Sequence, residues 1–196
     1  RITPSKVERL LAGWHDKITG NDIFPAQSFN LDFHSVPYSG DHPQVQSHYL
    51  SKRSRRQPST LAFLAQDADS NVFCYSNADL RKGEEADEIF RFIAFWQRQH
   101  GTPPQHLVFD SKLTTYANLS KLNALGITFI TLRRRSRPLA AQIASLPRSA
   151  WRTVELDVPH RKFKTPRVVE ERVNLKGYSG VVRQLLIRDL GHEEPT

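Results

Sequence analysis

The sequence predicts an α/β protein in which helices cover a mixed β-sheet and a smaller, strand-rich part follows. Three observations predict this fold class. An early strand is followed by two more, which the polar turn at residues 67–71 joins into a hairpin. Two helical segments then alternate with two further strands, which is typical of a sheet that becomes parallel. From residue 150 onward, only strand-like alternation of apolar and polar residues is seen.

The first elements combine a helix with an amphipathic strand. Residues 3–15 predict a helix with Val7, Leu10, Leu11 and Trp14 on one side. Residues 28–36 predict a strand. Because strand side chains alternate, its aromatic and aliphatic residues share one face, and its polar residues share the other. The apolar set is Phe29, Leu31 and Phe33, and the polar set is Asn30, Asp32 and His34.

The middle of the chain predicts a long polar connection, a hairpin and the clearest helix. Residues 37–59 are expected to form a long loop that carries a basic cluster, and such loops are usually functional or mobile. Strands at 60–66 and 72–76 form the hairpin. Residues 83–100 then predict a helix with acids at its start and bases at its end, an order that suits the helix dipole. Its apolar face comprises Ile89, Phe92, Ile93 and Trp96.

The second half continues with short elements. Residues 106–110 predict an apolar strand ending in Asp110, and residues 116–125 predict a helix with Leu119, Leu122 and Leu125 turned inward. The remaining elements are a strand at 127–132, a short helix at 138–146 and strands at 151–158, 167–175 and 181–189. These elements predict an N-terminal helical segment at 1–26, a core at 27–149 and a strand-rich insertion at 150–196.

Composition limits the class of protein. With 196 residues and 38% hydrophobic residues, the chain can bury a real core, and no apolar run approaches the ~18 residues of a membrane span. The chain lacks methionine and starts at Arg1, so we expect a fragment or an excised domain. The single cysteine, Cys74, excludes an internal disulfide and predicts a buried free thiol in a reducing, intracellular setting.

The net charge of +8 comes from clusters of lysine and arginine. Clusters of this kind suit a polyanion, and nucleic acid is the commonest one. The alternative is a solvated basic face with no partner. The residues predicted to contact DNA are Lys52, Arg53, Arg55, Arg56, Lys112, Arg133, Arg134, Arg135, Arg137, Arg161, Lys162 and Lys164. For Lys112, simple exposure to solvent is an equal alternative, and Phe163, amid the last cluster, either stacks on a base or anchors a strand.

Two acids stand out by their positions. Asp32 lies in the middle of the first strand, and Asp110 ends the fourth strand. If these strands are neighbours, the two carboxylates converge, and a divalent cation between them removes their repulsion. Oxygen ligands of this kind select Mg²⁺ or Mn²⁺ and serve two-metal phosphoryl chemistry. Alternatively, Asp110 is a helix cap. His34 shares the face of Asp32, where it either contacts the metal or phosphate directly or lies behind the ligands.

Residues 30–38, 106–114 and 127–133 resemble the DDE transposases of bacterial insertion sequences. The resemblance covers residues 29–196, and it is closest to the branch whose RNase H-like core carries a strand-rich insertion before the last acid. It implies Mg²⁺-dependent cleavage and strand transfer at transposon ends, with Asp32 and Asp110 as the first two acids of the triad. Implied partners are the duplex DNA of transposon ends and target, and a second copy in a homodimeric transposition complex. The implied location is cytoplasmic and nucleoid-associated, with no membrane.

One departure from the family pattern concerns the third acid. In such proteins a glutamate follows on a helix beyond the inserted strands, and no acid occurs between Arg133 and Arg152. We therefore expect the sequence to stop before that glutamate and to have little activity alone. Two other functions remain open: a non-catalytic DNA-binding remnant of a transposase, and an RNase H-like nuclease without a role in transposition.

Overall fold

The computed structural model describes residues 3–20, 27–41, 45–50, 54–81, 83–111, 115–159 and 161–188. It divides into two compact units, Arg1–Leu132 and Arg133–Thr196. The division lies before the helix that the sequence analysis assigned to the core, so that helix joins the C-terminal strands. Each unit is described below by itself.

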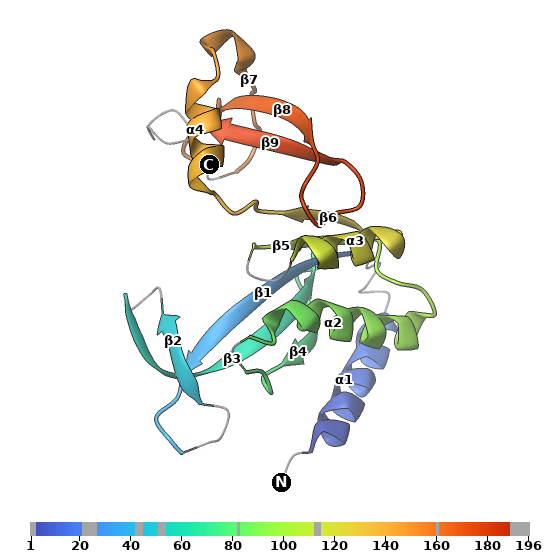
Figure 1. Cartoon of the computed structure of the whole chain (residues 1–196). Helices are drawn as coiled ribbons and strands as arrows, with labels where there is room; N and C mark the ends of the chain where they lie inside the picture. Colours follow the sequence, from blue (N-terminus) through green and yellow to red (C-terminus); the bar gives the residue numbers. More distant parts are fainter. Residues whose placement is uncertain are drawn as a thin grey trace. The chain divides into compact units, whose positions relative to one another are not determined.

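Unit 1, Arg1–Leu132, is built on a six-stranded sheet with the order β2-β3-β1-β5-β6, in which β4 also pairs with β3. β1 pairs antiparallel with β3 and parallel with β5, and β5 pairs parallel with β6. The predicted fold class, an RNase H-like mixed sheet with flanking helices, is therefore confirmed (Figure 1). The strands are β1 (Ser28–Pro37), β2 (Gln46–Leu50), β3 (Arg55–Asp67), β4 (Phe73–Asn77), β5 (His106–Phe109) and β6 (Thr128–Thr131).

Helix α2 (Glu85–His100) supplies most of the core above this sheet. Its predicted apolar face is confirmed, because Phe92, Trp96 and their neighbours Ile89 and Ile93 are all buried. The ring of Phe29 from β1 lies 5.2 Å from the ring of Phe92 and 4.6 Å from that of Trp96, in edge-to-face arrangements. α2 therefore packs on the face of the sheet that carries Phe29.

The two other helices of unit 1 pack beside α2. In α3 (Tyr116–Ala124), the amide Nδ2 of Asn118 donates to the carbonyl of Ala86 on α2, at 3.1 Å. In α1 (Pro4–Thr19), the ring of His15 lies edge-on to Phe95 and Trp96 of α2. All three helices thus lie on one side of the sheet, the covered face (Figure 1). The opposite side, which none of these three helices covers, is called the open face.

Two predicted helix faces differ from the structure. In α1, Val7, Leu10 and Trp14 are exposed, and the helix instead buries His15 and Ile18. α1 packs beside α2 through the ring of His15 and meets the edge strand β4, where the indole of Trp14 donates to the carbonyl of Phe73 at 2.7 Å. In α3, Leu125 lies just past the helix and is 41% exposed, contrary to prediction.

The stretch at residues 37–59, predicted to be a loop, contains two stretches of strand. β2 pairs with the first residues of β3, so that β3 begins at Arg55 rather than at residue 60. This two-stranded extension of the sheet, Gln46–Leu50 with Arg55–Ser59, is called the ribbon. Backbone hydrogen bonds between β2 and β3 define the ribbon, and its sequence has no apolar pattern. The polar sequence therefore did not indicate these strands.

Unit 2, Arg133–Thr196, combines helix α4 (Arg137–Ser145) and the short helix η2 (Arg148–Ala150) with a three-stranded antiparallel sheet. Its strands are β7 (Arg152–Thr153), β8 (Arg167–Val173) and β9 (Val182–Arg188). The strand predicted at 151–158 is reduced to β7. Val154 and Leu156 still bond to the backbone of Pro166 and Lys164, but proline cannot donate to a ladder.

The core of unit 2 forms where α4 lies on the sheet. Leu139 and Ile143 of α4 pack with Trp151 and with Leu186 of β9. The guanidinium of Arg188 lies over the indole of Trp151, 4.4 Å from the ring centroid.

Two features of composition have clear structural counterparts. Cys74 is a fully buried free thiol that donates to the carbonyl of Ala65, and burial raises its pKa to about 12. Such a thiol is protonated at neutral pH and unreactive. Within the described ranges, none of the helices combines the length and apolar character that a membrane crossing requires.

Candidate functional site

Asp32 lies on β1 with its side chain on the open face. Its neighbours Leu31 and Phe29 are buried on the covered face, and the alternation of the strand turns Asp32 away from them. The backbone N–H of Phe33 donates to Asp32 Oδ1 at 2.8 Å, which fixes the direction of the carboxylate. A charged group on a solvent-facing strand surface avoids the desolvation cost of burial.

Asp110 follows β5, the parallel neighbour of β1. Leu31 and Phe109 are the last partners in this ladder, so Asp32 and Asp110 are the next residues along two adjacent parallel strands. Phe109 is buried on the covered face, and the alternation therefore turns the following residue toward the side of Asp32. Adjacent strands are about 5 Å apart. The strands that carry the two acids are therefore adjacent, as predicted.

This donor set suits a hard divalent cation. Two carboxylates at the carboxyl ends of adjacent strands offer oxygen ligands, which Mg²⁺ and Mn²⁺ prefer. Across the ranges that the structure describes, no cluster of three or more His, Cys, Asp and Glu side chains suited to a metal is present. Two carboxylates alone could supply only part of the coordination shell of such a cation.

His34 extends the polar face of β1. It lies two residues beyond Asp32, its side chain is exposed, and its partner on β3 is Ala62. Two residues along a strand separate side chains by roughly 7 Å. His34 is therefore placed to meet a phosphate that approaches Asp32.

The basic residues of unit 1 lie on the ribbon. Arg55 and Arg56 are exposed at the start of β3, and Arg56 is directly opposite Tyr49 of β2. The ring of Tyr49 is 58% exposed. Of the other predicted contacts to DNA in this unit, Lys52, Arg53 and Lys112 lie outside the described residues.

The predicted cluster that follows β6 belongs to unit 2. Arg134, Arg135 and Arg137 are exposed, and Arg137 is the first residue of α4. Arg133 instead donates from Nη1 to Oε1 of Gln184 at 2.5 Å, and Gln184 also donates to Glu171. Arg133 therefore holds the link to β9 in addition to carrying charge.

The last predicted cluster forms a compact bend between β7 and β8. Arg161 donates from Nε to the carbonyl of Phe163 at 2.8 Å, and the ammonium of Lys162 lies 5.4 Å from the centre of the Phe163 ring. Lys162 covers part of an aromatic surface that the sequence suggested for a nucleobase. Lys164 is exposed.

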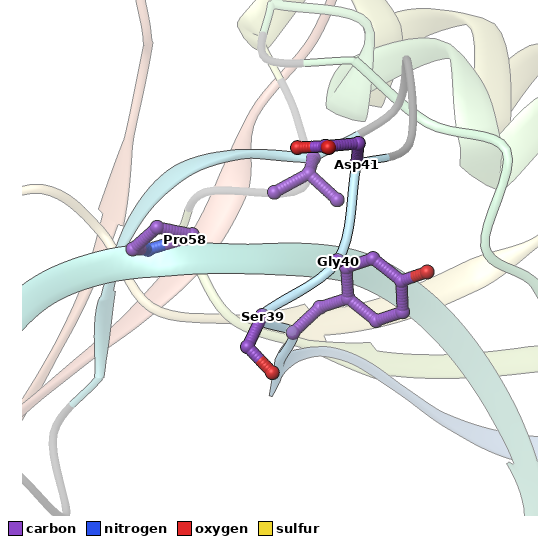
Figure 2. A pocket seen from close by; sticks show the side chains of 6 residues that line it. Ser39, Gly40, Asp41 and Pro58 are labelled. Carbon is purple, nitrogen blue, oxygen red and sulfur yellow. The ribbon is translucent and has the colours of Figure 1, made fainter.

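A hollow of about 330 Å³ lies at the base of the ribbon, and the sequence analysis did not identify it. Tyr38, Gly40, Asp41 and Pro58 line it together with Ser39 and Val45 (Figure 2). Tyr38 follows β1 directly, and its backbone N–H donates to the carbonyl of Pro58 on β3. The signal for it in the sequence is Tyr38, an aromatic residue at the start of a largely polar stretch.

Comparison with known proteins gives likenesses in structure but none in sequence. No protein-family model matches the sequence, and no curated protein matches it. Among solved structures, the chain is similar to a chain of the piggyBac transposase synaptic complex with hairpin DNA, with a TM-score of 0.48 and 12% identity. The match covers 98% of this chain and 40% of that chain, so this chain spans less than half of that transposase. No residue role and no part of the fold described above rests on this likeness.

Proposed function

We propose that this protein is the catalytic core of a DNA-cleaving and strand-transferring enzyme of the DDE transposase class. Asp32 and Asp110 are proposed to hold Mg²⁺ or Mn²⁺. The observation that carries the proposal is their register, in which the two acids follow the Leu31–Phe109 pair on adjacent parallel strands. Both strands belong to a sheet whose order is that of an RNase H-like core.

Each group on the open face has a distinct task in this proposal. Asp32 and Asp110 bind the cation through carboxylate oxygens, and the hydrogen bond from Phe33 to Asp32 orients one of these ligands. His34 steadies the phosphate beside Asp32. When bound, the cation activates the attacking hydroxyl and stabilises the leaving oxygen. Arg55 and Arg56 of the ribbon neutralise phosphates of the bound DNA. On unit 2, the exposed Arg134, Arg135 and Lys164 are proposed as further phosphate contacts.

Two features set the scope of the proposal. The sequence motifs resemble transposases of bacterial insertion sequences, whereas a similar solved structure is that of a piggyBac transposase. The proposal therefore concerns the DDE transposase class, and membership of the insertion-sequence branch is an expectation. A pair of carboxylates neutralises a two-metal centre incompletely. We therefore expect these 196 residues to bind the metal weakly and to cleave DNA slowly, and the third carboxylate is not assigned to a described residue.

Cleavage and joining test the function. With protein in excess and Mn²⁺ present, we expect slow nicking of supercoiled plasmid, and joining of an oligonucleotide 3′-hydroxyl to plasmid DNA. Asp32→Asn or Asp110→Asn should reduce both reactions at least roughly 100-fold, because each removes a ligand of the cation. DNA affinity should stay within about twofold, because arginine and lysine side chains carry it.

The matched control is Asp69→Asn, which changes an exposed acid in the β3–β4 turn. Its rates should equal those of the unsubstituted protein. Nicking that survives EDTA or both aspartate substitutions would refute the proposed site. Nicking without joining would favour the nuclease alternative over the transposase.

A further inference from the structure

The open face continues from the acid pair to the ribbon along a single long strand. On β3, every second residue from Leu64 to Arg56 belongs to this face, and Leu64 is the partner of Asp32. Leu64 is eight residues along the strand from Arg56, a distance of about 27 Å. One surface thus connects the candidate metal ligands with the exposed arginine of the ribbon.

Two aromatic residues lie beside this strip of β3. Tyr49 is the partner of Arg56, which places an exposed phenol ring next to an exposed guanidinium on the same face. Tyr38 is 45% exposed and forms one wall of the hollow beside Pro58. Flat rings that are open to solvent on a basic surface are the usual platforms for stacking nucleobases, and every base has a face that can stack.

The hollow itself suits a base better than a phosphate. A ring and a proline form its apolar walls, and the carboxylate of Asp41 lies at its rim (Figure 2). A carboxylate repels phosphate but accepts hydrogen bonds from the exocyclic amino group of a base. Gly40 lets the Tyr38 ring lie close, because a Cβ at this position would come within 2.7 Å of the Tyr38 hydroxyl.

We propose that the open face between Asp32 and Arg56 holds an unpaired DNA strand, with bases on Tyr38 and Tyr49 and a phosphate on Arg56. Paired bases stack inside a duplex and cannot present their faces to either ring, so an unpaired strand fits this surface and an intact duplex does not. The inference deepens the proposed function, because the strand would lead its end to the candidate metal ligands.

Binding of single-stranded and duplex DNA, measured in EDTA, tests this inference. The probes are a fluorescent oligodeoxycytidine, whose bases carry an exocyclic amino group, of roughly the length of an ordinary single-strand site, and a duplex of mixed sequence, with anisotropy followed across a salt series. Tyr49→Ala and Tyr38→Ala should weaken single-strand binding by about 5- to 140-fold each, the range expected for loss of one base stack. Both substitutions should change duplex affinity less than about twofold.

Arg56→Ala should lower the salt dependence of single-strand binding by roughly 0.7 in the log–log slope, the value of one phosphate contact. Arg9→Ala is the matched control, because Arg9 is an exposed arginine of α1, a helix on the covered side of the sheet. Trp14→Ala, an exposed aromatic on α1, is the control for the tyrosines. Both controls should leave single-strand affinity unchanged, and Tyr49→Phe should keep it, because the phenyl ring still stacks.

Equal losses for single-stranded and duplex DNA would overturn the inference, since the ribbon would then be an ordinary duplex contact. Unchanged single-strand affinity in both tyrosine variants would also overturn it, as would self-association that Tyr49→Ala abolishes. Because EDTA removes the metal, Asp32→Asn should bind the oligonucleotide normally. If the aspartate substitutions leave cleavage unchanged while the tyrosine substitutions weaken strand binding, only the proposed function is refuted. If the aspartate substitutions abolish cleavage while the tyrosine substitutions leave strand binding unchanged, only the strand path is refuted.

Discussion

At the scale of single residues, a contact between His15 and His100 links α1 to the end of α2. Their Nε2 atoms lie 2.5 Å apart, and the ring of His100 stacks on Trp96. Burial lowers the pKa of both histidines, and the neighbouring His15 lowers that of His100 further. Asp16, whose carboxylate lies 3.8 Å from His15 Nδ1, opposes the effect on His15.

This pair predicts a loss of stability in mild acid. The pKa values of both histidines in the folded chain lie below the ordinary histidine value of 6.5, so below about pH 6.5 the unfolded chain binds protons that the folded chain does not. The contribution is complete above pH 6.5 and declines as the pH falls. The free energy of unfolding should therefore drop between pH 7.5 and 5.5, and less so in His15→Gln/His100→Gln. The exposed His34→Gln is the control, and an identical drop in the double variant would contradict the account.

The residues of the site differ in how far sequence could predict them. Asp32 was predictable because an acid interrupts an alternating apolar strand, and Asp110 because it ends one. The positions of Tyr38 and Tyr49 were not, because Tyr49 meets Arg56 across the β2–β3 pairing and Tyr38 follows β1 and bonds to the backbone of Pro58. Arg133 was identified by charge alone, whereas its bond to Gln184 depends on how residues far apart in the sequence meet in unit 2.

At the scale of elements, α1 and α2 show why amphipathic sequence is an incomplete guide. Both helices were predicted to bury an apolar face. α2 does so because the sheet lies beneath it, whereas α1 packs beside α2 and an edge strand and leaves Leu10 73% exposed. Periodicity shows that a face is apolar, and only the arrangement of elements determines what covers it.

Paired truncations in these two helices measure the difference. Phe92→Ala removes a fully buried ring that contacts Phe29 and Tyr75, and it should lower the free energy of unfolding by about 3–5 kcal/mol. Leu10→Ala removes an exposed side chain and should cost no more than about 0.5 kcal/mol. Urea denaturation at neutral pH gives both values. A cost for Leu10→Ala near that of Phe92→Ala would show that α1 packs on its apolar stripe.

For the whole molecule, the order of the strands was the most predictable feature. A strand, a hairpin and two helix–strand pairs permit few topologies, because parallel connections are right-handed and neighbours in sequence tend to pair. The position of the boundary was less predictable. α4 resembles the core helices in sequence, but its buried residues Leu139 and Ile143 pack with Trp151 and Leu186.

Of the net charge of +8, unit 2 carries +7, from 14 basic and 7 acidic residues, and unit 1 carries +1, from 14 basic and 13 acidic residues. Arg55 and Arg56 lie on unit 1, whereas Arg134, Arg135 and Lys164 lie on unit 2. Some basic residues also have structural tasks, since Arg183 and Arg152 form ion pairs with Glu170 on the sheet of unit 2. Charge content alone therefore overstates the number of side chains available to phosphate.

The location of a bound Mn²⁺ ion tests the central claim, that Asp32 and Asp110 share a divalent cation. Paramagnetic broadening of backbone amide signals by Mn²⁺ reports the position of the ion without requiring catalysis. The account predicts broadening centred on residues 31–34 of β1 and on residues 109–111, and its loss in Asp32→Asn and in Asp110→Asn but not in Asp69→Asn. Broadening centred elsewhere, or unchanged by either aspartate substitution, would contradict it.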